Sequence, residues 1–172
     1  TFSTPMSKYI LSALYAQKSW ANRELFDVVA AVSPTDNADR LHTAVRTLNH
    51  IYVVDRIFRA HLLNERHPYT ATNTTETPEL GELHFAQAET DGWFESYVNG
   101  LGEHDLQQSL TFQFTDGDIG TMTREEILFH VLTHGSYHRG NVGQVLKDMG
   151  VAPPRDLFTK FLHVREPSRR SA

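Results

Sequence analysis

From residue 123 the chain reads Thr123-Arg-Glu-Glu-Ile-Leu-Phe-His-Val-Leu-Thr-His-Gly-Ser-Tyr-His-Arg-Gly140. A threonine followed three residues later by a glutamate is the capping-box pattern that begins many helices. Apolar residues then recur at helical spacing up to Met149, and Gly150 follows at a position typical of a helix end. The segment therefore predicts a long helix over residues 124–149.

Three histidines in this helix, His130, His134 and His138, lie four residues apart. Residues at i and i+4 share one face of an α-helix about one turn apart, so His134 and His138 can converge on one point. That spacing suits two imidazoles that chelate one divalent metal ion. Each step of four residues drifts by about 40° around the helix. We therefore expect His130 to pack beside the two ligands rather than to bind the metal.

Further helices are predicted from apolar residues at helical spacing. The first begins with Thr4-Pro5, an N-cap followed by proline at the first helical position. The third follows Thr77-Pro78, which repeats that pattern. The predicted ranges are 5–32, 38–63 and 79–98 for the long helices and 156–163 for a short amphipathic helix at the end.

A β-hairpin is predicted between the third and fourth long helices. Residues 109–114 alternate polar and apolar side chains, Thr115-Asp-Gly-Asp118 has turn chemistry, and residues 119–122 read as the return strand. The predicted fold class is all-α: a four-helix bundle with a short β-hairpin before the last long helix and a short C-terminal helix. Since the composition does not shift along the chain, we expect a single domain over residues 1–172.

Composition narrows the classes of function. The formal net charge of −5 opposes nucleic-acid binding, which relies on clustered lysine and arginine. No apolar run approaches the roughly 20 residues of a membrane span, so we expect no membrane partner. The chain has no cysteine, which excludes disulfides and cysteine-based metal sites. With no secretory signal pattern at the N-terminus, these features predict a cytoplasmic protein.

The third metal ligand must come from another helix, and the second helix carries His42, His50 and His61. His50 lies mid-helix among core positions, where a bundle can aim side chains at facing helices. His61 is eleven residues away, an axial rise of roughly 16 Å, and His42 lies about 12 Å in the other direction. His50 is therefore the best-placed candidate. The other histidines, namely His42, His61, His67, His84, His104 and His163, are expected at the surface.

Glycines and one arginine mark the surroundings of the histidine pair. Gly135, Gly140 and Gly143 each cost about 1 kcal/mol relative to alanine in a helix interior. Close approach of a neighbouring helix or ligand explains such glycines, and flexibility at an exposed face is the alternative. Arg139 is expected either to bind a substrate carboxylate or to pair with an acid of the second helix such as Asp55. Tyr52 and Tyr137 are candidates to line a pocket.

These motifs resemble those of a known family. Residues 126–142, together with Leu48-Asn-His-Ile51 and the later Asp156-Leu-Phe158, resemble the DinB/YfiT-like metalloenzyme family. The order of the helices and the hairpin before the histidine-rich helix also agree, so the resemblance spans nearly the whole chain. The family most often has glutamine where this chain has Asn141, a departure that we expect to leave the ligands untouched.

The resemblance implies a four-helix bundle, often dimeric, with one divalent transition metal held by three histidines, here His50, His134 and His138. Zinc or nickel is expected, with iron as an alternative. Three imidazoles leave a coordination position open, which is typical of a catalytic site. The family resembles thiol-dependent transferases and isomerases, so we expect a small-molecule substrate and a low-molecular-weight thiol, with a hydrolase as another outcome. A non-catalytic, stress-associated metal-binding protein is the alternative.

Overall fold

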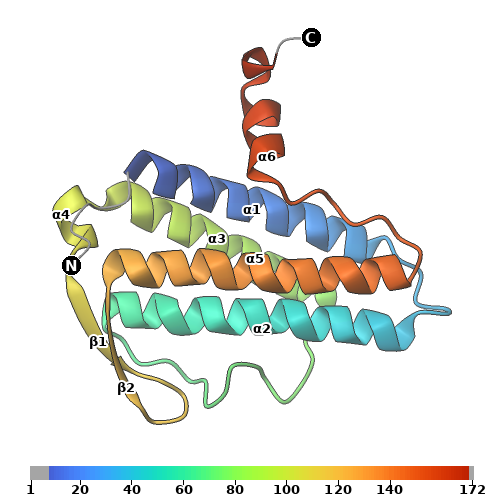
Figure 1. Ribbon diagram of the computed structural model, residues 1–172. Coiled ribbons are helices and arrows are strands. Elements are labelled where there is room, and N and C mark those ends of the chain that lie inside the picture. Colours follow the sequence, from blue (N-terminus) through green and yellow to red (C-terminus); the bar gives the residue numbers. More distant parts are fainter. Residues whose placement is uncertain (1–7, 171–172) are drawn as a thin grey trace.

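Four long helices form the body of the molecule in the computed structural model, which describes residues 8–170 (Figure 1). They are α1 (Lys8–Ala30), α2 (Ala38–Leu63), α3 (Leu80–Gly100) and α5 (Arg124–Asp148). α1 packs chiefly against α3, and α2 packs chiefly against α5. The predicted helical bundle is confirmed, and α2 has the predicted bounds. The cap predicted at Thr4-Pro5 lies outside the described residues.

The smaller elements follow α3 and α5 in the sequence. They are α4 (Glu103–Leu106), β1 (Ser109–Gln113), β2 (Ile119–Thr123), α6 (Phe158–Arg165) and a 3-10 helix, η1 (Pro167–Arg169). The hairpin lies beside the end of the bundle where α5 begins, whereas α6 projects away from it (Figure 1). The hairpin and α6 were predicted; α4 and η1 were not. Within residues 8–170, no helix has the length and apolar character needed to cross a bilayer.

Local hydrogen bonds explain where two of the long helices begin. Thr123 accepts a hydrogen bond from the Glu126 backbone N–H at 3.2 Å, and its own N–H donates to the Glu126 carboxylate at 2.7 Å. The predicted capping box of α5 is thus confirmed. The cap predicted for α3 at Thr77-Pro78 is wrong, because the carboxylate of Glu79 accepts the Glu82 N–H at 2.9 Å and starts the helix later.

The apolar core consists of two clusters at different levels of the bundle. The first cluster lies towards the hairpin and includes Leu11, Tyr15, Phe58, Phe94, Leu128 and Val131. The second cluster includes Leu25, Phe26, Leu48, Leu83, Val142 and Leu146. Each long helix contributes side chains to both clusters, so burial of both holds all four helices together.

A layer of buried charge separates these two clusters. Lys18 Nζ lies 2.6 Å from Asp55 Oδ2 and 2.7 Å from Asp91 Oδ1, and all three side chains are at most 3% exposed. Gln87 donates to both carboxylates and Asn22 donates to Asp91. Burial raises the pKa of Asp55 above its usual value, against the opposing effect of Lys18. We call these five residues the polar layer.

Candidate metal centre

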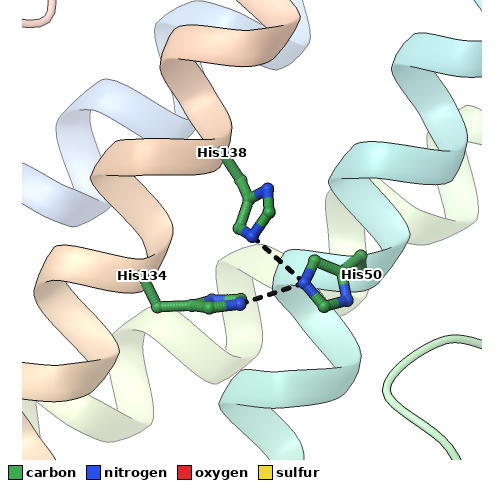
Figure 2. A group of neighbouring side chains, drawn as sticks. All are labelled: His50, His134 and His138. Atoms are coloured by element: carbon green, nitrogen blue, oxygen red, sulfur yellow. Dashed lines mark hydrogen bonds between the residues drawn. The ribbon is translucent and has the colours of Figure 1, made fainter.

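The three histidines implied by the resemblance lie together between α2 and α5. His50 Nε2 is 3.0 Å from His134 Nε2 and 3.2 Å from His138 Nε2. One ring nitrogen from each of the three residues falls within 4.8 Å of the others. Figure 2 shows His134 and His138 one turn apart on α5, pointing across at His50. No other His, Asp or Glu of residues 8–170 completes the cluster as a fourth member.

The donor atoms suit one divalent cation. Nitrogen ligands at 2.0–2.1 Å around a tetrahedral metal lie about 3.3 Å apart, close to the two Nε2–Nε2 distances found here. His50 Nδ1 lies 2.7 Å from the carbonyl oxygen of Thr72 and donates its proton there. The Nε2 of His50 therefore keeps its lone pair, which is the form that binds a metal. His134 Nδ1 is buried without a hydrogen-bond partner, so no protein group at Nδ1 holds the proton there or on Nε2.

The third ring contacts the residue at which the chain departs from the family pattern. Asn141 Nδ2 lies 3.3 Å from His138 Nδ1, and the three-histidine set itself is unchanged by the departure. With Asn141 donating to Nδ1, the proton of His138 sits on Nε2 and donates to His50. Metal coordination by His138 requires the other tautomer, which is favoured when the Asn141 carboxamide turns its oxygen towards Nδ1.

Burial keeps the imidazoles of α5 neutral. The pKa of His134 is lowered to about 3, first by burial and then by the neighbouring rings of His50, His138 and His130 and by Lys18. Burial, followed by His50, also lowers the pKa of His138. Metal binding requires neutral imidazole, so the lowered pKa values of His134 and His138 favour the form that binds.

His130 lies beside the triad. Its ring centroid is 5.7 Å from that of His134 and 4.7 Å from that of Phe58, and burial lowers its pKa. It does not join the three-histidine cluster. This placement agrees with the packing role expected from the drift of the helix.

Arg139 has a different partner from the one expected. Its Nε donates to Asp156 Oδ2 at 2.6 Å, and the guanidinium is almost fully buried. Asp55, the partner favoured from sequence, is already paired with Lys18 of α1. The apolar stripe of α1 passes through Lys18, since Leu11, Tyr15 and Leu25 lie on the same side of the helix, and that interruption was the available signal.

His61 was expected at the surface, and this is wrong. Its side chain is 8% exposed and stacks on Phe112 of β1 with ring centroids 4.4 Å apart. Burial and then His67 lower its pKa to about 4. The hairpin covers this end of α2, and the sequence pattern does not reveal which helix a hairpin covers. His84 is also partly buried, against Phe26, whereas His42 and His104 are exposed as expected.

Close packing explains one of the three glycines in α5. A Cβ on Gly135 would lie 3.2 Å from the Arg139 guanidinium, whereas one on Gly143 would make only an ordinary contact of 3.5 Å with Pro153. Gly140 has open space around it, so close approach does not explain that residue. Gly135 therefore leaves room for the Arg139 guanidinium, and the Lys18 side chain of the polar layer lies near the same residue, next to His134 in the sequence.

A cavity of about 340 Å³, which we call the apolar pocket, opens beside the triad. His50 and His134 form part of its wall. Its other lining residues are Val54, Ile57, Phe58, His61, Thr72, Phe114, Thr115, Met122 and His130. Neither Tyr52 nor Tyr137 lines it, although Tyr137 lies edge-on to His138 at 5.1 Å. The contribution of the hairpin was not predicted, because its position over α2 and α5 depends on tertiary packing.

Comparisons with known proteins agree with this architecture. Residues 6–169 match the DinB family. Protein DinB of Bacillus subtilis (strain 168) is 25% identical over 153 residues, which cover 81% of this chain and 86% of that protein. No solved structure gave a significant match. Because the family match extends over nearly the whole chain, the protein belongs to the DinB family.

Proposed function

We propose that this protein is a metal-dependent enzyme in which His50, His134 and His138 hold one divalent transition metal ion. The observation that carries the proposal is the convergence of three Nε2 atoms from two helices beside the apolar pocket. Imidazole ligands suit zinc or nickel, with iron as an alternative. Three protein ligands leave at least one coordination position free, as in catalytic sites.

The chemistry belongs to a small class of reactions. A bound metal supplies a Lewis acid that lowers the pKa of a coordinated water or thiol. The surrounding residues orient the site: the Thr72 carbonyl holds the His50 ring, and His134 Nε2 lies 3.0 Å from His50 Nε2. The apolar pocket places uncharged side chains beside the same point.

We infer a thiol-dependent S-transferase or isomerase acting on a small molecule, with a hydrolase as the variant in which water replaces the thiol. The chain has no cysteine, so the thiol must come from a low-molecular-weight cofactor. A reducing cytoplasm, in which thiols are kept reduced, is the compartment that this chemistry requires.

A non-catalytic, stress-associated metal-binding protein is the second candidate. In its favour, no Asp or Glu of the described residues joins the triad or lines the apolar pocket to act as a general base. The two candidates differ in whether an added thiol or water can reach the metal.

Metal analysis and a cobalt experiment test the proposal. Purified protein, reconstituted with zinc or nickel, should contain close to one metal per chain, and His134→Ala or His50→Ala should abolish binding. His104→Ala is the control, because His104 is exposed on α4. Absence of metal from the reconstituted protein would refute the site.

In the cobalt-loaded protein, an added low-molecular-weight thiol should produce a thiolate-to-cobalt charge-transfer band. Transfer assays with several cofactor thiols then identify the reaction. A cobalt spectrum that no thiol changes, together with a full complement of metal, would favour the non-catalytic candidate.

We also propose that the protein is a homodimer. Support comes from large apolar side chains on the outside of the long helices: Phe85 of α3 is 79% exposed, and Phe129 and Tyr137 of α5 are 49% and 70% exposed. Light scattering coupled to size-exclusion chromatography tests this, and a monomer mass at the highest concentration would refute it.

A further inference from the structure

The apolar pocket and the triad share two residues, His50 and His134. A ligand atom that reached the three Nε2 atoms would therefore have the rest of its molecule next to this cavity. The pocket lies between α2, α5 and the hairpin, so its shape depends on both the bundle and the hairpin. The side chains that line the pocket therefore influence which molecules the site accepts.

The walls of this pocket are apolar. Val54, Ile57 and Phe58 of α2 form one side, and Phe114 and Met122 of the hairpin region form another. Among its described lining residues there is no Asp, Glu, Lys or Arg to pair with an ionic substituent. Burying a charge without such a partner is costly, so the body of the ligand must be uncharged.

The volume sets the size of that body. The pocket measures about 340 Å³, near the lower end of the 300–1,000 Å³ found for small-molecule sites. A dry cavity of about 150 Å³ already accommodates benzene. The pocket therefore has room for one substituted ring or a branched alkyl group, but not for a large polycyclic ligand.

The aromatic wall at Phe114 is held in place despite being 40% exposed. Its ring lies across Gly120 of β2, where a Cβ would come within 2.5 Å of Phe114 Cε2. It also packs edge-on against Phe112 with ring centroids 5.0 Å apart. Phe112 is in turn stacked on His61. A glycine opposite the ring and an aromatic neighbour thus position Phe114 as part of the wall.

We propose that the substrate of this site is a small molecule with a compact, uncharged apolar body, an aryl ring or a branched alkyl group, that occupies the apolar pocket and carries a sulfur or oxygen head group directed at the three histidines. Phe114 and Met122 are the specificity-determining residues, and Gly120 positions Phe114. This inference rests on the proposed function for the role of the head group, whereas the binding of the apolar body depends on the pocket alone.

Toluene, which has no head group, tests the pocket in the metal-free protein. Titration should give a saturable shift of the Met122 methyl resonance and leave Met149, which packs in the second core cluster, unchanged. Phe114→Ala should weaken toluene binding by about tenfold through loss of an aromatic contact. Phe85→Ala, which removes an exposed phenylalanine of α3, should leave it unchanged.

Two results would overturn the pocket assignment: no saturable shift of Met122, or equal loss of binding in Phe114→Ala and Phe85→Ala. Gly120→Ala gives a second route to the same wall, because its methyl group displaces the Phe114 ring without removing it. Thermal unfolding of each variant confirms that the fold is intact.

The cobalt-loaded protein tests the head group. Phenylmethanethiol should bind at least about tenfold more tightly than 2-mercaptoethanol, as read from the charge-transfer band, because its ring is buried in the pocket. Phe114→Ala should reduce this preference. If cobalt does not bind, the proposed function fails and the toluene titration still decides the pocket. If cobalt binds and the two thiols bind equally, the present inference fails and the proposed function stands.

Discussion

His50 and His138 show how neighbouring groups set the proton positions of a candidate ligand. The Thr72 carbonyl holds the proton of His50 on Nδ1, whereas Asn141 can either donate to His138 Nδ1 or accept from it. The Nε2 lone pair of His138 is free only when Asn141 accepts a hydrogen bond from Nδ1. The carboxamide at position 141 is therefore a positioning group for the third ligand.

We predict that Asn141→Ala lowers the metal affinity by about tenfold, at the lower end of the range for groups that orient a ligand. The loss should come from the His138 tautomer, so the metal should still bind at one per chain. Competition with a chromophoric chelator measures the affinity. Asn99→Ala, at an exposed position of α3, is the control. An unchanged affinity in Asn141→Ala would contradict this role.

His61 makes the stability of the metal-free protein depend on pH. The unfolded chain binds a proton at this residue near the ordinary pKa of about 6.5, whereas the fold lowers the pKa to about 4. Between these values the unfolded state binds more protons, so the free energy of unfolding falls as the pH drops, by at most about 1.4 kcal/mol per pH unit. Above this window His61 is neutral in both states and the dependence disappears.

We predict that His61→Leu removes this part of the pH dependence, because leucine does not titrate. Urea unfolding at a series of pH values from neutral down to about 4 measures it. His104→Leu at an exposed site should keep the slope of the wild type. Equal slopes in His61→Leu and the wild type would contradict the assignment.

At the scale of elements, the capping box at Thr123 fixes the residue at which α5, the helix that carries His134 and His138, begins. The reciprocal bonds of Thr123 and Glu126 satisfy backbone donors that the helix leaves unpaired.

We predict that Thr123→Ala lowers the free energy of unfolding by about 1 kcal/mol, measured by urea unfolding. Thr123→Ser keeps the hydroxyl and should retain most of the stability. Equal losses in the two variants would mean that the capping bond contributes nothing.

Elements with strong local signals were predictable, and contacts between elements were not. The bounds of α2 and the cap of α5 follow from periodicity and from a short-range motif. The start of α3 was misplaced, because the Glu79 carboxylate competes with the Thr77-Pro78 pattern for the same role. The pairing of Lys18 with two acids and the covering of His61 by the hairpin depend on tertiary packing, which the periodicity of one helix does not encode.

At the scale of the whole molecule, the candidate ligands join the two halves of the chain. His50 and His134 are 84 residues apart in sequence. The four-residue spacing indicates that His134 and His138 can share a metal, whereas the distance between His50 and this pair is set by the fold. A metal bound at this point would bind the folded state and not the unfolded chain.

We therefore predict that zinc raises the thermal unfolding midpoint. At a free concentration about 100-fold above the dissociation constant the gain is about 2.7 kcal/mol, which for a domain of this size is about 5–10 °C. Differential scanning calorimetry with zinc and with chelator measures it. His134→Ala should show no zinc-dependent gain. A zinc-dependent rise that persists in this variant would place the metal elsewhere.

The polar layer fixes the positions of the helices along their axes in the bundle. Apolar burial is not directional, so a slide that exchanges one leucine contact for another costs less than a slide that separates a buried ion pair. A slide of a single turn, about 5.4 Å, would instead leave Lys18 or its two carboxylates buried and uncompensated. Lys18 lies near Gly135, where a Cβ would be 3.5 Å from its Cε, so we expect the same layer to set the height at which the imidazoles of α5 meet His50. The relative positions of the three histidines thus depend on charged residues that do not contact them.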